Sequence, residues 1–500
     1  GTATAFARWH SLLTLDVRPS YLSHEFFVGP AGDLNGDAFD DFFVGDPNFN
    51  LGQGYLKIIY GSECPDTIAG WFAQIPNVHP SCFGAWAKVI NDMDGDDFDE
   101  IIVGAPLYAW HSGRVFLYST NPLDTTYDQH FSGGNEGFGA YHASGDFNGD
   151  RYNDLLIGEG AYQPFISRAS AYLFLGSSEI DANPDWIYAD STDLPVQHFR
   201  MKTGSGGDFN ADGYDDFSVF EDIYYGDIDS FFYEDNLFLG NAEIDFIPLI
   251  TTDIHVRWMG DLNNDGMADF KRSWDQNDTL HIKLYYGNTD ADTFHTQELY
   301  NHYFESGELL LFTSPFGDFN NDSFDDILIL RGPDPENRYG FWAELWYGGA
   351  ELDTIPDEIF GIPYLSAIVN IGDINGNGTG EIMVRQRLAN DSTSTSIFTQ
   401  DPSDVSNDIT MSQNPNIRLY VFPNPFNSST IIRFSLEAES YVELTVFDIL
   451  GRQIDRLVDS HLTPGHHQIE WDAGDRPSGI YFYRLVTQDT AVTGRMTLLR

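Results

Sequence analysis

The chain has 500 residues, too many for one ordinary domain, and its 42% hydrophobic and 15% aromatic content indicates a packed core rather than a disordered protein. Its 77 acidic side chains against 25 lysines and arginines give a formal net charge of −52, which disfavours a nucleic-acid partner because phosphate binding needs the opposite sign. No apolar run reaches the roughly 18 residues of a membrane-spanning helix, so we expect no transmembrane segment.

The first predicted strand is SLLTLDV at 11–17, and it precedes a nine-residue acidic motif that recurs along the chain. DLNGDAFDD begins at residue 33, and six further copies follow: DMDGDDFDE at 92, DFNGDRYND at 146, DFNADGYDD at 208, DLNNDGMAD at 261, DFNNDSFDD at 318 and DINGNGTGE at 373. Successive copies begin 53–62 residues apart, a regularity that indicates a repeat architecture.

Short strands are predicted around these motifs. Most copies are followed by an apolar run such as FFVG, IIVG or LLIG, and later by a second run that often closes on glycine, such as GYLKIIYG or SAYLFLG. Such aromatic and β-branched runs, bounded by Gly, Asp and Asn, are typical of strands, and no convincing long helical periodicity appears between residues 33 and 381. A period of about 57 residues predicts a four-stranded blade, so seven copies predict an all-β, seven-bladed β-propeller.

The last blade lacks one strand. After the seventh motif only EIMVRQRL and SIFTQ read as strands, so we expect residues 11–17 to complete this blade and close the ring. The alternative is a frayed N-terminal extension.

Two cysteines, Cys64 and Cys82, lie early in the chain. They either form a disulfide, worth about 3 kcal/mol if the protein is exported, or remain two buried thiols.

The acidic motif has the pattern of a cation-binding loop. Oxygen-bearing side chains occupy positions 1, 3, 5 and 9, and hard cations such as Ca²⁺ prefer oxygen ligands. Glycine or asparagine is common at position 4 or 6, where a chain that wraps an ion needs positive φ. Position 7 is usually aromatic, and we expect its side chain to pack inward while its carbonyl faces the ion.

We therefore predict up to seven Ca²⁺ sites, because crowded protein oxygens suit Ca²⁺ better than Mg²⁺. The predicted ligands, loop by loop, are Asp33, Asn35, Asp37, Phe39 and Asp41; Asp92, Asp94, Asp96, Phe98 and Glu100; Asp146, Asn148, Asp150, Tyr152 and Asp154; Asp208, Asn210, Asp212, Tyr214 and Asp216; Asp261, Asn263, Asp265, Met267 and Asp269; Asp318, Asn320, Asp322, Phe324 and Asp326; and Asp373, Asn375, Asn377, Thr379 and Glu381.

Two alternatives explain the motif less well. An EF-hand needs a glutamate at position 12, but that position holds Val44, Val103, Ile157, Val219, Arg272, Ile329 and Val384. A metal-free turn leaves the repulsion among 21 carboxylates at the ligand positions uncompensated. The pattern is intact in loops one to four and six. The exit FKRSW of loop five is poorly strand-like, and loop seven has only two acids, so we expect it to bind most weakly.

At these residues the sequence resembles the FG-GAP repeat family, which builds the seven-bladed propeller of integrin α-subunits. The resemblance covers about residues 20–400 and is carried by the acidic loops, whereas the Phe-Gly element, present at Phe83-Gly84 and Phe138-Gly139, is missing from several repeats. In that family the cations are mostly structural and lie away from the ligand-binding face. The resemblance therefore implies structural calcium sites within a domain at 1–400.

The remaining chain predicts a different domain. Residues 401–418 have the polar composition of a linker, and residues 419–500 predict a small immunoglobulin-like antiparallel β-sandwich of six or seven strands. This tail resembles the type A C-terminal sorting domain of type IX secretion substrates, through PNPF, DILGR, PSGIYFYRL and the basic-ended RMTLLR. The resemblance implies that the type IX secretion machinery exports the protein across the outer membrane of a Gram-negative bacterium, with release or surface anchoring. The alternative is an ordinary adhesion module.

No catalytic constellation is apparent. The motifs G-x-S-x-G and H-E-x-x-H and a phosphate-binding glycine loop are missing, and His24-Glu25 and His466-His467 are isolated pairs. Six tryptophans either line a glycan-binding face or pack within blades: Trp9, Trp71, Trp110, Trp186, Trp258 and Trp274. We expect a secreted or surface-displayed binding protein whose propeller holds a protein or glycan ligand. The alternative is a secreted carbohydrate-active enzyme, a lyase or hydrolase.

Overall fold

The structure is all-β, as predicted. The computed structural model describes residues 9–15, 26–63, 65–75, 78, 80–108, 113–133, 137–160, 170–189, 198–224, 231–244, 246–252, 256–276, 279–289, 296–303, 309–332, 340–349, 352, 356–363, 365–387, 393–400, 419–422, 428–436, 440–448, 452–463, 465–474, 476–487 and 491–498. The chain forms two compact units, a propeller (Leu12–Ile359 with Pro363–Phe398) and a C-terminal unit built on Thr399–Arg500. The predicted linker at 401–418 lies outside the described residues.

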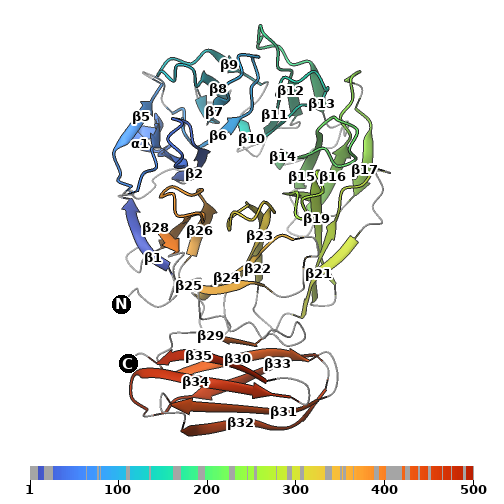
Figure 1. The fold of residues 1–500 in the computed structure, drawn as a ribbon. Helices are drawn as coiled ribbons and strands as arrows, with labels where there is room; N and C mark the ends of the chain where they lie inside the picture. The colour runs from blue at the N-terminus through green and yellow to red at the C-terminus, as the bar shows by residue number, and fades with distance from the viewer. Residues whose placement is uncertain are drawn as a thin grey trace. The chain divides into compact units, whose positions relative to one another are not determined.

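Seven four-stranded antiparallel sheets form the propeller, one blade for each acidic loop (Figure 1). Blade 1 contains β2 (Phe27–Gly32), β3 (Asp41–Gly45), β4 (Leu56–Ile59) and β5 (Ala69–Ala73), with a helical turn α1 (Phe49–Gly52). Blade 2 contains β6 (Trp86–Ile90), β7 (Glu100–Ala105), β8 (Arg114–Ser119) and β9 (Gln129–Phe131). Blade 3 contains β10 (Phe138–Gly145), β11 (Asp154–Glu159), β12 (Ser170–Phe174) and β13 (Trp186–Ala189).

The other blades follow the same order. Blade 4 contains β14 (His198–Gly207), β15 (Asp216–Tyr224), β16 (Phe231–Phe238) and β17 (Pro248–Thr252). Blade 5 contains β18 (Val256–Gly260), β19 (Asp269–Gln276), β20 (Thr279–Tyr285) and β21 (Thr296–Tyr303). Blade 6 contains β22 (Leu309–Gly317), β23 (Asp326–Gly332), β24 (Gly340–Trp346) and β25 (Glu358–Pro363). Blade 7 contains β26 (Leu365–Asn370), β27 (Ile382–Arg387), β28 (Thr393–Gln400) and β1 (Trp9–Leu15), and β1 pairs with β28.

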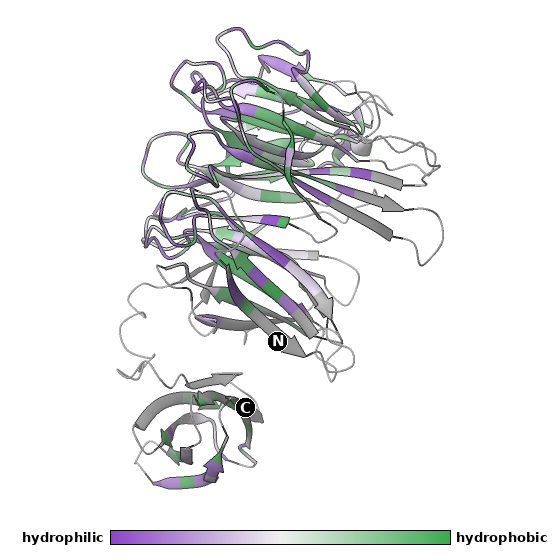
Figure 2. Ribbon diagram, turned by 90° about the vertical axis from the view of Figure 1, so that its right-hand side faces the viewer, coloured by the Kyte–Doolittle hydropathy of each residue, from purple (hydrophilic) through white to green (hydrophobic). Residues whose placement is uncertain are grey.

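The propeller core lies between neighbouring blades. The second strands β3, β7 and β11 are buried along their whole length, because each is covered on both faces by the adjacent blades. This explains their continuous apolar sequence. Blades 1 and 7 share one such core, in which Phe42 and Val44 pack with Ile374 and Met383. Hydrophobic residues follow the strands, whereas hydrophilic residues are concentrated in the loops between them (Figure 2).

The exit of loop five is a regular strand, so the expectation that FKRSW is poorly strand-like is wrong. β19 pairs with β18 on one side and with β20 on the other. Its charged side chains are accommodated because neighbouring strands supply the hydrogen bonds and cover Lys271, so tertiary context overrides local propensity.

The cysteines are described in part. Cys82, in the segment between β5 and β6, is a buried free thiol, and Cys64 lies outside the described residues.

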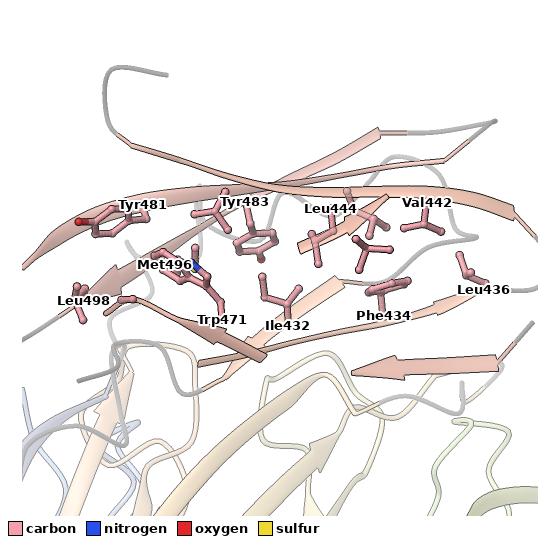
Figure 3. Close-up of a cluster of buried hydrophobic side chains, with 14 residues drawn as sticks. Ile432, Phe434, Leu436, Val442, Leu444, Trp471, Tyr481, Tyr483, Met496 and Leu498 are labelled. Carbon is pink, nitrogen blue, oxygen red and sulfur yellow. The ribbon is translucent and has the colours of Figure 1, made fainter. Parts of the chain in front are cut away.

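The C-terminal unit is a small β-sandwich. One sheet has the order β29 (Leu419–Phe422), β30 (Ser429–Leu436) and β33 (Gly465–Asp472); the other has the order β32 (Gln453–Leu462), β31 (Ser440–Asp448), β34 (Gly479–Val486) and β35 (Ala491–Leu498). Side chains from both sheets point into one core, which includes Phe434, Leu444 and Trp471 (Figure 3). Among the described residues of the chain, no helix has the length and apolar character needed to cross a membrane.

Candidate metal centres

All seven acidic loops adopt the same local conformation. The carboxylate at position 1 accepts hydrogen bonds from the backbone N–H groups of positions 5 and 6, at 2.7–3.2 Å. Positions 4 and 6 both have positive φ in every loop. At position 6 this holds even for Ala38 (φ 71°) and Arg151 (φ 76°), although the left-handed region costs an L-residue about 1 kcal/mol. The shared conformation is therefore imposed by the loop and not by glycine alone.

The position 9 carboxylates are buried at the base of the loops, with 0–1% of each residue exposed. Each accepts a hydrogen bond from the position 2 N–H at 2.6–3.0 Å. In five blades the second oxygen accepts from the glycine N–H that follows the third strand, at 2.8–2.9 Å. Desolvation raises the pKa of Asp154 to about 8 and that of Asp41 to about 6, against the opposing effect of these backbone bonds.

Loop two gathers the most complete set of acidic ligands. Carboxylate oxygens of Asp92, Asp94, Asp96 and Glu100 all lie within 4.8 Å of one another. Blade 2 has no glycine after its third strand, and Oε1 of the buried Glu100 has no hydrogen-bond partner. Four carboxylates, one of them buried with an unpartnered oxygen, form a donor set that fits a hard divalent cation.

The residue at position 3 explains why the acidic side chains of loops three to six are arranged differently from those of loop two. In loops three to six an asparagine side chain donates from Nδ2 to the position 5 carboxylate, at 2.8–2.9 Å. Asp94 of loop two is an acceptor only, so it cannot make this bond and its carboxylate faces the other three acids. Positions 1, 3, 5 and 9 are therefore held on one loop in each blade, as the sequence predicts.

The position 7 side chains do not pack inward, and that expectation is wrong. Phe98 is 47% exposed, and no residue at this position is fully buried. A Cβ on Gly149 of loop three would lie 2.5 Å from the Tyr214 ring, and one on Gly376 of loop seven would lie 2.7 Å from the Phe39 ring. The position 7 ring therefore covers the position 4 glycine of the preceding loop. Its backbone N–H donates to the position 5 carboxylate.

Position 2 fills the core place that was expected for position 7. It holds an apolar residue in every loop, and from Met93 onward these side chains are fully buried: Met93, Phe147, Phe209, Leu262, Phe319 and Ile374. The sequence contained this signal, because position 2 is apolar in all seven copies of the motif.

Position 8 joins neighbouring blades, a role that the sequence analysis missed. The Asp215 N–H donates to the Asp146 carbonyl at 2.9 Å, and the Asp146 N–H donates to the Asp215 carboxylate at 2.9 Å. Asp325 and Asp261 form the same reciprocal pair, at 3.2 and 2.9 Å. Asn153 and Ala268 make only the backbone bond. The signal was an aspartate at position 8 in four copies of the motif.

Several of the six tryptophans pack within the blades, which is one of the two alternatives that the sequence left open. Trp71 and Trp258 are buried, and Trp186 packs against the rings of Phe217 and Phe238. Trp274 stacks on His281, with ring centroids 5.1 Å apart. The side chains of Trp9 and Trp110 lie outside the described part of the structure.

Comparison with known proteins decides the nature of the C-terminal unit. Residues 420–498 match the family described as the secretion system C-terminal sorting domain. The tail belongs to that sorting-domain family. The predicted type IX secretion domain is thereby confirmed, and the protein is secreted or displayed at the surface of a Gram-negative bacterium.

The propeller is integrin α-like, which confirms the FG-GAP resemblance. The chain is 27% identical to integrin alpha-5 of Xenopus laevis over 218 residues, which is 40% of this chain and 20% of the integrin. It is 34% identical to integrin alpha-7 of Rattus norvegicus over 165 residues, which is 30% of this chain and 14% of the integrin. The chain thus spans a fifth or less of the integrins that it matches.

Among solved structures, the chain is similar to PorZ, a bacterial surface component of the type IX secretion system of Porphyromonas gingivalis. The sequence identity is 13%, and the match covers 92% of this chain and 64% of PorZ. The TM-score of 0.26 is too low to indicate a shared fold.

Proposed function

We propose that the propeller is a calcium-stabilised binding platform for a protein or glycan ligand, exported by type IX secretion through its C-terminal domain. The observation that supports this most directly is the carboxylate cluster of loop two, where Glu100 is buried with an unpartnered oxygen. Similarity to integrin α-subunits over 40% of the chain supports the same reading of the loops that the match covers.

Calcium would supply the positive charge that the loops lack. The predicted ligand positions hold 21 carboxylates, and the whole chain carries −52 charges. In loop two the residues that would hold the ion are Asp92, Asp94, Asp96 and Glu100, with the Phe98 carbonyl as a further ligand. We expect loop seven to bind most weakly because its acids are Asp373 and Glu381 alone.

The proposed ions stabilise the ring and do not contact the ligand. Each loop is bonded through positions 1 and 8 to the loop of an adjacent blade, as between Asp146 and Asp215. An ion that fixes one loop therefore also fixes a contact between two blades. A rigid ring is a suitable support for a ligand-binding face, since less conformational entropy is lost on binding.

Calcium titration of the full chain tests the metal part of this proposal. Isothermal titration of calcium-stripped protein should show binding of up to seven ions, and the melting temperature should rise with calcium. An unchanged melting temperature after calcium removal, together with no heat of binding, would contradict it. The enzyme alternative is tested with the same preparation: polysaccharide turnover that is lost on replacing an acid outside the loops would favour it.

A further inference from the structure

The propeller concentrates unpaired cations near the centre of its ring. The first strands of the blades lie innermost, and β18 of blade 5 contacts the first strands of blades 4 and 6, β14 and β22 (Figure 1). Arg257 lies on the first strand of blade 5, β18, and its backbone partner on β19 is Lys271. Paired residues of antiparallel strands share one face, so two positive charges lie side by side. In a chain of net charge −52 this is an unexpected place for like cations.

Lys271 is buried, with 3% of the residue exposed. The hydrogen bond of its ammonium group goes to the Ser273 hydroxyl, at 3.3 Å. Within the described part of the chain, no carboxylate lies within ion-pair distance of Lys271 or Arg257. A buried ammonium group without a counter-charge costs several kcal/mol, so this arrangement lacks a partner.

The nearest charged groups of the adjacent blades do not supply that partner. On blade 6, Glu344 lies on the face toward blade 5; its Oε1 forms an ion pair with Arg331, whereas its Oε2 is buried without a hydrogen-bond partner in the described structure. On blade 4, the buried Asp235 accepts a hydrogen bond from the Val256 N–H at 2.7 Å. Asp235 is also near the positive charges of Arg257, Arg272 and Lys202, so cations outnumber acids there.

A second unsatisfied donor lies in the same interface. Trp346 of blade 6 packs in the core between blades 5 and 6, and its indole N–H is buried without a hydrogen-bond partner. Lys271 faces this interface, because its neighbour on β20, Leu284, belongs to the same core. Among the described residues, the Trp346 N–H lacks an acceptor and the Lys271 ammonium donates only to the Ser273 hydroxyl, so both groups can donate to a ligand that brings acceptor oxygens.

We propose that Arg257 and Lys271, with the Ser273 hydroxyl, bind a single carboxylate or sulfate group between blades 5 and 6, near the centre of the ring. The guanidinium group suits bidentate contact with either oxyanion, and the buried ammonium adds charge. Burial, and next the Arg257 charge, lowers the pKa of Lys271 to about 7, and a bound anion would keep this group protonated. The site does not depend on calcium.

The test uses sodium sulfate and sodium acetate as probes, each titrated into the full chain at constant ionic strength with excess calcium. Arg257→Gln should raise the sulfate dissociation constant at least tenfold, and Lys271→Met should do the same. Lys283→Gln is the matched control, because Lys283 lies in blade 5 but pairs with Arg272 on the opposite face. The sulfate affinity of Lys283→Gln should equal that of the wild type.

Arg257 is exposed, so its variant should fold even if Lys271→Met does not. Equal sulfate affinity in wild type and Arg257→Gln would overturn the proposal. So would the absence of any saturable sulfate binding by the wild-type protein. Sulfate stabilises most proteins because it is excluded from their surface. A rise in melting temperature is therefore not sufficient evidence, and the experiment must measure binding directly.

Discussion

Asp40 and Asp373 join the first acidic loop to the last by two reciprocal hydrogen bonds. The Asp40 N–H donates to the Asp373 carbonyl at 3.0 Å, and the Asp373 N–H donates to the Asp40 carboxylate at 2.8 Å. The two residues are 333 positions apart. The ring is therefore closed at its acidic loops as well as by the pairing of β1 with β28.

Removal of the Asp40 carboxylate should weaken this closure. Asp40→Ala leaves the Asp373 N–H without its acceptor, and the expected loss is about 1–3 kcal/mol in the free energy of unfolding, measured by urea denaturation. Asp40→Asn keeps an acceptor oxygen and should lose less. Glu243→Ala removes an exposed acid and is the control. If Asp40→Ala behaves like that control, the hydrogen bond contributes little to stability.

Glu100→Gln should have opposite effects with and without calcium. Without calcium it removes a buried charge whose pKa desolvation raises to about 8, so the melting temperature should rise at pH 8.5. With calcium it removes a ligand, so the affinity of one site should fall at least tenfold in a calorimetric titration. Asp97→Asn is the control within the same loop, because position 6 is not a predicted ligand. Equal calcium affinity in both variants would remove Glu100 from the ligand set.

Calcium-free protein should lose stability as the pH rises from about 4 to 8. Desolvation raises the pKa values of Asp216, Asp269 and Asp326 to about 7, and that of Asp154 to about 8. Between the ordinary value of 3.8 and these raised values the folded state binds more protons than the unfolded state. The stability that these four acids contribute is therefore fully present below their ordinary pKa and is lost as the pH rises through the raised values.

Melting temperatures of dialysed protein across this pH range, with and without calcium, check that prediction. Calcium should abolish most of the decline, because the ion stabilises the charged carboxylates. A calcium-free curve that is flat or rises between pH 5 and 8 would contradict the burial argument for these four acids.

The sorting domain should be sufficient for export. Fusion of residues 419–500 to a periplasmic reporter, in a bacterium with type IX secretion, should move the reporter to the surface or the medium. Trp471→Ala removes a ring that is 1% exposed in the sandwich core and should cost about 3–5 kcal/mol. The expected result is loss of export, whereas Tyr441→Ala, at an exposed site, should leave it intact. Export of both variants would show that a folded core is not needed.

Much of this fold was predictable because its strongest signals repeat. The spacing of the acidic motifs indicated seven blades, and the apolar runs after each motif became the buried strands β3, β7 and β11. The strand β19 was misjudged because its charged residues are stabilised by neighbouring strands that local propensity does not describe. The unpaired charges of Arg257 and Lys271 were invisible for the same reason, since their proximity arises from strand register.

Alternation alone predicts the ligand positions, but it does not predict the contacts between loops. The motif predicted no role for position 8, although Asp215 bonds to the adjacent loop. Position 7 was assigned inward because it is aromatic, yet the Tyr214 ring lies against Gly149 of another blade. Both errors have one cause: a single motif does not reveal which atoms of the next repeat will face it.

Five junctions between described blades use the main-chain N–H of position 8 and the carbonyl of position 1, groups that every residue type except proline can provide. Asn153 and Ala268 donate the same main-chain hydrogen bond to the preceding loop as Asp215 does. The blades at these five junctions therefore present the same connector to the blade that follows. Gene duplication or recombination that exchanges whole repeats would preserve the assembly, while the outer loops remain free to diversify.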